Sequence, residues 1–541
     1  MYGFETQLVD TIVRFLLGLL GLILLEAAAG VFLGLCVYND ACYRGDSNPV
    51  LWGVLSGFFN IVALVYIIVQ LSSKNKTAFC VQCRAPIPQG YTVCPACGMP
   101  LFLRGKPVSA EQMEGFRRRR KLFLILFIVF FAVALIWLLM SAFGALPFFF
   151  SGFFPSYVDC FFESVSGFTT TGASVLTAVE PLPRGILFWR SFMHWMGGMG
   201  VLILTIALLP SLGGRTLHVM RAESPGPIVS KLVPKTSQSS KILYGIYCAL
   251  TLLEVFCLRI AGMPWYDSLV HSFATAGTGG FSTRNLSIAA YESPAIEVII
   301  TLFMLVFSIN FALYFLLLCG KVHQALRSDE LRFFLAVVAF STLLISINIW
   351  PMYPADGSAV RHAAFQVGSI ISTTGFASTD FNLWPEFSRI LLVLLMFIGA
   401  CAGSTGGAIK CSRVLLLLKC IRREIRQVVH PRSVNVVKLD GRVVDEDSLR
   451  SVQLFFAAYL FIALGATLLV SVDNFSFGTT FTAVVSCIGN VGPGLELVGP
   501  MGNYSAFSGF SKLVLSLCML IGRLEVLPVL VLFSRNAWKR S

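Results

Sequence analysis

Charged side chains are scarce in this sequence. Asp, Glu, Lys and Arg make up 13% of its 541 residues, whereas 56% are hydrophobic and the mean hydropathy is +0.78. So few charges leave most of that apolar surface uncovered in water, which excludes an ordinary soluble protein. The stretch 122–140 contains no charge at all. Its length matches the ~20 apolar residues needed to cross the ~30 Å hydrocarbon core of a bilayer.

Other absences exclude further classes of protein. The first apolar stretch, 12–35, lacks the small-residue cleavage pattern of a secretory signal peptide and is too long for one, so it reads as a membrane helix. The net charge is +13, but no soluble basic face with base-reading groups accompanies it, which argues against nucleic acid as a partner. The six His are scattered, whereas an enzyme within the membrane would need converging His, Asp and Glu groups. We therefore expect no catalytic residues and no enzyme activity.

The basic residues are grouped in alternate loops, and the loops between them contain few. This distribution follows the positive-inside rule, which orients helices during membrane insertion. We therefore expect an all-α, multi-pass protein of the cytoplasmic (inner) membrane, with ten transmembrane helices and both termini in the cytoplasm. The basic tracts are 74–121, 213–241, 319–332, 410–450 and 535–540. The predicted spans are 11–37, 50–72, 122–143, 185–210, 242–262, 294–319, 331–350, 387–418, 452–472 and 508–534.

Four more apolar segments are too short for a span and rich in Gly, Thr and Ser. They are predicted on the extracellular side, at 155–176, 265–286, 359–380 and 475–497. Each reads as a re-entrant half-helix followed by extended backbone, which membranes tolerate only inside protein or along a water-filled path. Their aligned glycines Gly172, Gly280, Gly375 and Gly492 are 108, 95 and 117 residues apart. Such a period indicates an internal repeat.

The repeat accounts for the last eight predicted helices as four tandem helix–pore-loop–helix units around a pseudo-fourfold pore. The predicted domains are 1–72, with two N-terminal helices; 73–121, a cytoplasmic loop; and the pore repeats 122–210, 242–319, 331–418 and 452–535.

The composition of the four loops suits a cation filter. A potassium filter replaces the hydration shell of the ion with rings of backbone carbonyls. Glycine permits the φ values that turn these carbonyls inward. The loop tips contain no acidic residue, and the C-terminal end of each half-helix would favour a cation. Close helix packing is the alternative explanation for small residues in a membrane. Four loops in register on one side favour the filter.

From residue 122 to the C-terminus the sequence resembles the TrkH/TrkG potassium uptake proteins, within the Trk/Ktr/HKT superfamily of cation transporters. The motifs that carry the resemblance are FFESVSGFTTTGAS (161–174), HWMGGMG (194–200), GTGGFST (277–283), STTGFASTDF (372–381), MFIGACAGSTGGAIK (396–410), GNVGPGL (489–495) and GRLEVLP (522–528). The resemblance implies potassium uptake through a selectivity filter. It also implies a homodimer and a separate TrkA-type cytoplasmic nucleotide-binding subunit, because this chain has no Rossmann fingerprint. The filter residues that it implies are Thr170, Thr171, Gly172, Thr278, Gly279, Gly280, Thr373, Thr374, Gly375, Asn490, Val491 and Gly492.

A glycine-rich segment interrupts the third repeat. The segment 399–407 reads GACAGSTGG, and Gly in a helix interior costs about 1 kcal/mol relative to Ala. The sequence therefore predicts a broken helix below the filter, with close helix packing as the alternative. The resemblance implies an intramembrane gate made of Gly399, Gly403, Ser404, Thr405, Gly406 and Gly407.

Arg523 lies in the last apolar segment. An intramembrane Arg is costly and faces the bundle interior or a wet cavity. By resemblance it points into the pore beneath the filter, as part of the gate. A buried pair with Glu525 is the alternative, although positions two apart do not share a helix face. Glu163 and His271, each nine residues before a filter glycine, are interpreted as hydrogen-bonded packing residues.

Four of the fifteen cysteines form two CxxC pairs at 80–97. Cys80, Cys83, Cys94 and Cys97 can supply four thiolates in a tetrahedron, the geometry of a structural zinc site. The segment falls in a predicted cytoplasmic loop, where disulfides are disfavoured. The sequence thus predicts a zinc-ribbon-like insert. Typical members of the family lack this insert.

Potassium uptake is the leading interpretation, with potassium as the transported ion. A sodium- or proton-coupled symporter, or a mixed potassium and sodium transporter, stays open, because the loops indicate what binds but not whether flux is coupled. A zinc-ribbon scaffold with a mere membrane anchor would not need four filter-like loops.

Overall fold

The computed structural model describes residues 136–211, 236–354, 357–430 and 435–523, with Val37, Tyr38, Ala41 and four short strands between 78 and 107. The chain divides into two compact units. The unit Met140–Val531 contains all four predicted pore loops, and the other consists of Met1–Leu139 and Leu532–Ser541. The spans predicted at 11–37 and 50–72 lie outside the described residues, apart from Val37.

Short strands occur only as hairpins in the part of the chain that is described. All three hairpins are two-stranded and antiparallel. The described fold is therefore predominantly helical, as expected, with three small additions to an all-α plan. The pairs are β1 (Ala78–Phe79) with β2 (Pro86–Ile87), β3 (Phe102–Leu103) with β4 (Lys106–Pro107), and β5 (Lys438–Leu439) with β6 (Arg442–Val443).

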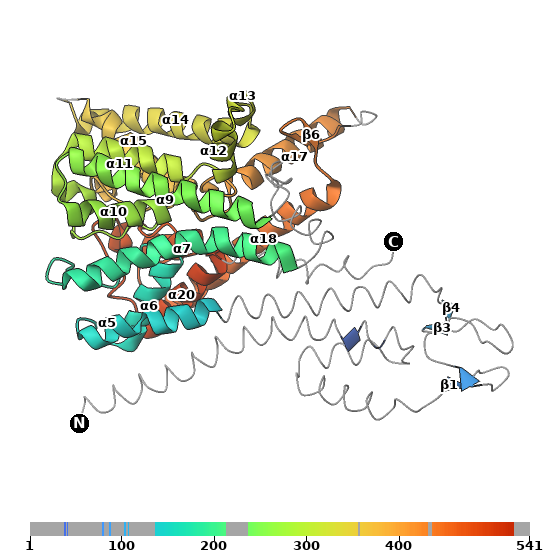
Figure 1. The fold of residues 1–541 in the computed structure, drawn as a ribbon, viewed down its shortest axis with the longest axis horizontal. Helices are drawn as coiled ribbons and strands as arrows, with labels where there is room; N and C mark the ends of the chain where they lie inside the picture. The colour runs from blue at the N-terminus through green and yellow to red at the C-terminus, as the bar shows by residue number, and fades with distance from the viewer. Residues whose placement is uncertain are drawn as a thin grey trace. The chain divides into compact units, whose positions relative to one another are not determined.

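The helices follow the predicted order of spans and short pore segments (Figure 1). The first half contains α5 (Leu146–Ser151), α6 (Tyr157–Phe168), α7 (Arg184–Ser211), α9 (Thr236–Ile260), α10 (Trp265–Gly277), η2 (Ser287–Tyr291), α11 (Pro294–Phe307) and α12 (Phe311–Leu318). The second contains α13 (Val322–Leu326), α14 (Asp329–Ile349), η3 (Trp350–Met352), α15 (Ser358–Ile371), η4 (Phe381–Leu383), α16 (Glu386–Ile398), α17 (Cys411–Val429), α18 (Glu446–Val470), η5 (Ser471–Asp473), α19 (Phe477–Gly489), η6 (Glu496–Val498) and α20 (Gly509–Arg523).

Three described helices are long and apolar enough to cross a membrane: Ile242–Ile260, Asp329–Met352 and Glu446–Asp473. The pair α11 and α12 adds a fourth span if it is counted as one, but the two helices meet at 92°. The span predicted at 294–319 is therefore broken into two helices. The Asn310 side chain accepts a hydrogen bond from the Ala312 N–H at 2.9 Å and starts a new helix. The total of ten spans stays a prediction.

The short helices α6, α10, α15 and α19 are the predicted half-helices. Serine caps begin two of them, because the hydroxyls of Ser156 and Ser476 accept hydrogen bonds from free backbone N–H groups of the first turn. Each of three half-helices packs between two other helices: α10 against α7 and α9, α15 against α11 and α14, and α19 against α18 and α20. Helix α6 packs against α7 and α20, so the first and last parts of this unit are in contact.

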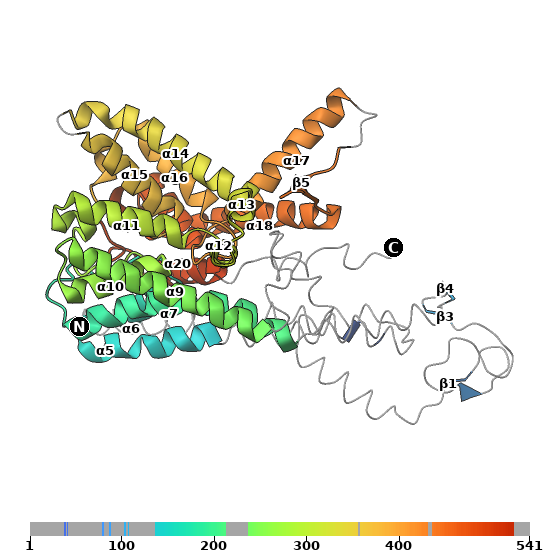
Figure 2. The same cartoon turned by 45° about the horizontal axis from the view of Figure 1, so that its top comes forward.

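Helix α17 differs from the others in composition and direction. It projects away from α14 and α15 in both views (Figures 1 and 2). Its first turns are buried, including Cys411 and Arg413, whereas Ile425 and Val428 near its end are exposed. The helix therefore begins inside the bundle and extends out of it.

Candidate functional site

The four predicted filter loops have the same backbone. In each, a residue with positive φ is followed two positions later by a glycine with positive φ. Successive residues of an ordinary strand point to opposite sides. A residue in the left-handed region breaks this alternation and so changes the direction in which the backbone polar groups point. The φ values are 55° and 83° for Thr170 and Gly172, 56° and 76° for Thr278 and Gly280, 60° and 80° for Thr373 and Gly375, and 53° and 103° for Asn490 and Gly492.

The four glycines each lie against a carbonyl oxygen of the next loop. A Cβ on Gly172 would meet the oxygen of Gly279 at less than 3.0 Å, and one on Gly280 would meet the oxygen of Thr374 in the same way. The same holds from the third loop to the fourth, where the oxygen belongs to Val491. The circuit then closes, because a Cβ on Gly492 would lie 2.6 Å from the oxygen of Thr171. The loops thus surround one axis, and a side chain at any of the four positions would displace a carbonyl.

The ring is buried and contains no carboxylate. Thr170, Thr171, Thr373 and Asn490 are 0% exposed. The Asn490 side chain donates to the Thr171 hydroxyl at 3.0 Å and so connects the fourth loop to the first. The loop residues supply backbone and side-chain oxygens but no negative charge. A cation in this ring would therefore be stabilised by the dipoles of carbonyl and hydroxyl groups.

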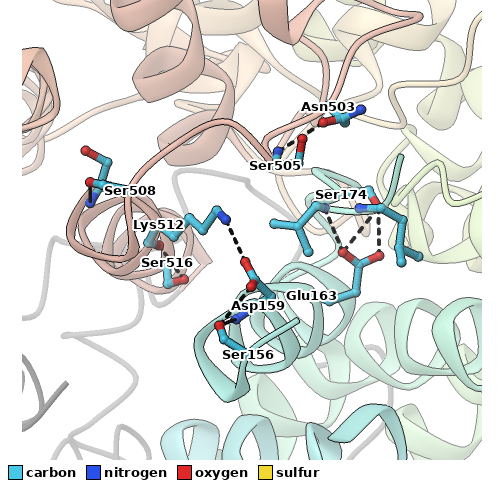
Figure 3. A network of polar contacts seen from close by, with 12 residues as sticks. Ser156, Asp159, Glu163, Ser174, Asn503, Ser505, Ser508, Lys512 and Ser516 are labelled. Carbon is cyan, nitrogen blue, oxygen red and sulfur yellow. Dashed lines mark hydrogen bonds and ion pairs between the residues drawn. The ribbon is translucent and has the colours of Figure 1, made fainter. Parts of the chain in front are cut away.

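Each of the first two half-helices is bonded to the chain just after its own filter glycine. The Glu163 carboxylate accepts hydrogen bonds from the Ser174 hydroxyl at 2.9 Å and from the Val175 N–H at 3.0 Å (Figure 3). In the second repeat His271 Nε2 lies 2.9 Å from the Ser282 hydroxyl, and the residues of both pairs are eleven positions apart. These bonds agree with the interpretation of Glu163 and His271 as hydrogen-bonded residues.

A second set of braces lies one turn earlier on the half-helices. The Thr283 hydroxyl donates to the Asp267 carboxylate at 2.9 Å, and His362 Nδ1 lies 3.3 Å from the Ser378 hydroxyl. Both pairs are sixteen residues apart. The matching separations show that the second and third loops are each bonded to their own half-helix at equivalent distances along the chain.

Two buried ion pairs reinforce the first half-helix. Arg190 on α7 pairs with Glu163 at 2.7 Å. Lys512 on α20 pairs with Asp159 at 2.6 Å and so connects the last described helix to the first half-helix (Figure 3). Sequence reasoning did not find Asp159 or Lys512, although a Lys within an apolar helix was a signal for a buried partner.

The glycine-rich segment lies outside helix, as the sequence led us to expect. Helix α16 ends at Ile398, and α17 begins at Cys411. Gly399 and Gly403 have φ of 70° and 72°, and even Lys410 has φ of 79°. The chain between the two helices is therefore a turn-rich loop, which we call the 399–410 loop.

The 399–410 loop contacts the first filter residue of several pore loops. The Gly407 N–H donates to the Thr373 hydroxyl at 2.7 Å, and the Thr278 hydroxyl donates to the Thr405 carbonyl at 3.1 Å. A Cβ on Gly407 would also lie 2.9 Å from the Cβ of Asn490. These residues lie within two positions of the ends of the half-helices, so the loop lies at that end of the ring.

Arg523 joins the 399–410 loop to the first repeat. Its guanidinium donates to the Thr405 carbonyl at 2.8 Å and to the Gly197 carbonyl on α7 at 3.1 Å. Only 7% of the residue is exposed. Glu525, the alternative partner suggested by the sequence, lies outside the described residues.

The predicted zinc ligands cannot be placed beside this site. Cys80, Cys83, Cys94 and Cys97 lie outside the described residues, although β1 and β2 pair on either side of the segment with the first CxxC motif. In the described part of the chain, no group of three or more His, Cys, Asp or Glu is arranged to hold a metal ion. The zinc site therefore stays a prediction.

Comparison with known proteins identifies the family. Residues 108–540 match the family model TrkH, described as cation transport protein. The Trk system potassium uptake protein TrkH of Escherichia coli (strain K12) is 40% identical over 419 residues, which cover 76% of this chain and 86% of the relative. TrkG of the same strain is 34% identical, with 76% and 85% covered. The crystal structure of the potassium transporter TrkH from Vibrio parahaemolyticus superposes with a TM-score of 0.67 at 30% identity, covering 95% of this chain and all of that one.

These matches are transport proteins, which confirms the expectation that the chain is not an enzyme. The family match covers the four pore loops, the 399–410 loop and Arg523, but it begins after the paired CxxC motifs. The chain belongs to the TrkH family of cation transport proteins.

Proposed function

We propose that this chain takes up potassium ions across the cytoplasmic membrane through the ring of four loops. The closed circuit of glycine-to-carbonyl contacts carries the proposal, because four equivalent carbonyls around one axis are what a dehydrated potassium ion requires. The relatives named as potassium uptake proteins support the choice of ion.

The ion ligands in this proposal are the oxygens of the residues at and just before the four glycines. The helices α6, α10, α15 and α19 end immediately before these residues, so their partly negative C-terminal ends add to the attraction for a cation. The proposed ligand residues are Thr170, Thr171, Gly172, Thr278, Gly279, Gly280, Thr373, Thr374, Gly375, Asn490, Val491 and Gly492.

The 399–410 loop, with Arg523, is the proposed gate. Its bonds to Thr278 and Thr373 support this role, because they hold the loop against the end of the ring where the half-helices end. Arg523 puts a positive charge beside the same route and bonds the loop to α7. A like charge in a low-dielectric passage raises the energy of a passing cation.

We also propose an orientation of the chain in the membrane, its protein partners and a role for the zinc-ribbon-like insert. The basic loops and both termini face the cytoplasm, two copies form a homodimer, and a TrkA-type subunit acts on the gate. The paired CxxC motifs hold one structural zinc ion. Coupling of potassium to sodium or protons stays the alternative to a channel-like pathway.

Flux into proteoliposomes tests the proposal. Potassium uptake by the purified protein is expected to exceed sodium uptake under the same gradient. Uptake that changes with an imposed proton or sodium gradient would instead indicate coupling. Equal potassium and sodium uptake, or none of either with the gate loop shortened, would reject the filter assignment.

A further inference from the structure

Glu330 lies next to the 399–410 loop, although no sequence pattern marked it as a functional residue. It is the second residue of α14, and only 6% of it is exposed. Its Oε1 accepts a hydrogen bond from the Ala402 N–H at 2.6 Å and another from the Ser412 N–H at 3.1 Å. Ala402 is near the start of the loop, and Ser412 comes just after its end. One carboxylate oxygen therefore bonds both ends of the loop.

When the Glu330 carboxylate is ionised, these bonds are stronger than ordinary backbone hydrogen bonds. A carboxylate acceptor makes charge-assisted bonds, which are about twice as strong as neutral ones. Ser412 belongs to the first turn of α17, where backbone N–H groups have no partner within the helix and the helix dipole favours a negative charge. Glu330 thus caps α17 and holds the start of the loop at the same point.

The backbone closes the loop at the same place. The Cys411 N–H donates to the Ala400 carbonyl at 3.0 Å. The neck of the loop consists of 400–402 on one side and 411–412 on the other. Both sides are buried, with Cys401 and Cys411 exposed by 1% and 0%. Movement of the loop away from the filter as a unit must disturb this neck.

The residue before Glu330 connects the neck to the β5–β6 hairpin. The Asp329 carboxylate accepts from Lys419 Nζ at 2.8 Å and from the Asp440 N–H at 3.2 Å. In return the Asp440 carboxylate accepts from the Asp329 N–H at 2.6 Å, which satisfies a free donor at the start of α14. Two successive acidic residues therefore bind in opposite directions, one to the loop and the other to the hairpin.

We propose that Glu330 is a positioning residue that latches the 399–410 loop beneath the filter, and that the β5–β6 hairpin holds this latch in place through Asp329. The inference rests on the proposed role of the loop as the gate. Release of Asp440 from Asp329 loosens the first turn of α14, withdraws the Glu330 carboxylate from the neck and lets the loop leave the ring.

The latch is tested on full-length protein in proteoliposomes with Glu330→Ala and Glu330→Gln. Thiol labelling by a membrane-permeant maleimide, read at each cysteine by mass spectrometry, reports opening at Cys401 and Cys411. Buried Cys160 lies in the first half-helix, α6, and reports the fold of the same molecules. Glu297→Ala is the matched control, because Glu297 is a buried carboxylate that pairs with Arg361 at 2.7 Å.

Glu330→Ala is expected to raise labelling of Cys401 and Cys411, relative to Cys160, by about tenfold or more, since it removes two charge-assisted bonds. Potassium flux should rise with it, while potassium-over-sodium selectivity stays unchanged because the filter is intact. Glu330→Gln keeps an oxygen acceptor without the charge and should fall between wild type and Glu330→Ala. Glu297→Ala should leave the labelling ratio at the wild-type value.

An unchanged ratio in a folded Glu330→Ala protein overturns the latch. If Glu330→Ala exposes Cys160 as well as Cys401 and Cys411, its fold is lost, and a wild-type ratio in Glu330→Gln then overturns the latch instead. Removal of 402–406 separates this inference from the gate itself. If that deletion raises flux while the Glu330 variants label normally, only the latch fails. If labelling rises in Glu330→Ala but neither variant changes flux, the latch holds the loop and the gate assignment fails.

Discussion

Substitution of Gly172 by Ser tests the filter most directly. A Cβ at this position would come within 3.0 Å of the Gly279 carbonyl oxygen, and the φ of 83° is unfavourable for any residue with a side chain. The left-handed conformation alone costs about 1 to 2 kcal/mol for an L-residue. The added atom must also push the neighbouring carbonyl out of the ring. Potassium, the larger and more easily dehydrated ion, should lose more from a misplaced carbonyl than sodium does.

The expected effect is a fall in the potassium-to-sodium permeability ratio of at least about tenfold, which corresponds to about 1.4 kcal/mol. Under bi-ionic conditions such a fall shifts the reversal potential by about 59 mV, which a voltage-sensitive dye resolves in proteoliposomes. Gly492→Ser should have a smaller effect, because its Cβ would lie 2.6 Å from the Thr171 oxygen and needs a shift of only 0.4 Å (3.0 minus 2.6) to reach 3.0 Å.

Gly245→Ser is the matched control. Gly245 lies in α9, and a Cβ there would meet nothing within 4 Å. It should leave both flux and selectivity at wild-type values. A folded Gly172→Ser protein with the wild-type reversal potential would refute the assignment of this ring as the selectivity filter.

Three further outcomes are expected. Arg523→Ala should raise potassium flux, because it removes both a positive charge and the bonds to Thr405 and Gly197. Arg523→Lys keeps the positive charge but not the planar guanidinium, so low flux in that variant assigns the effect to charge. Reduced flux in a folded Arg523→Ala protein contradicts the gate role. Elemental analysis should find about one zinc per chain, the stoichiometry of a four-thiolate site. The metal should be lost when both CxxC pairs are replaced by Ser, and unchanged metal content would reject the site. Hydrogen bonds from the Ser476 and Thr479 hydroxyls lower the pKa of Glu496 in η6. The ionised Glu496 therefore stabilises the folded protein at pH values above the ordinary carboxyl range, and this stabilisation is lost as pH falls through the lowered folded-state pKa. Thermal unfolding of Glu496→Gln should therefore depend less on pH in that acidic range, and an unchanged acid dependence would show that this carboxylate is not responsible.

The parts of the structure that the sequence predicted depend on local properties of the chain. The four half-helices, the positive φ of the filter glycines and the helix break at 399–407 follow from hydropathy and glycine content within short windows. The same windows did not indicate the break within 294–319. Those residues are largely apolar, but the Phe311 N–H bonds the Gly403 carbonyl across the bundle instead of continuing the helix.

The sequence by itself determined that four glycine-containing loops recur in a membrane protein and that one helix is interrupted. Only the tertiary structure decided that the loops close into one circuit, that Arg523 reaches Gly197, and that Glu330 bonds residues 72 and 82 positions away. The partners in these contacts are largely backbone N–H and C=O groups, which almost every residue possesses. A sequence can therefore indicate which side chain needs a partner in a membrane, but the packing of the helices selects which backbone group it meets.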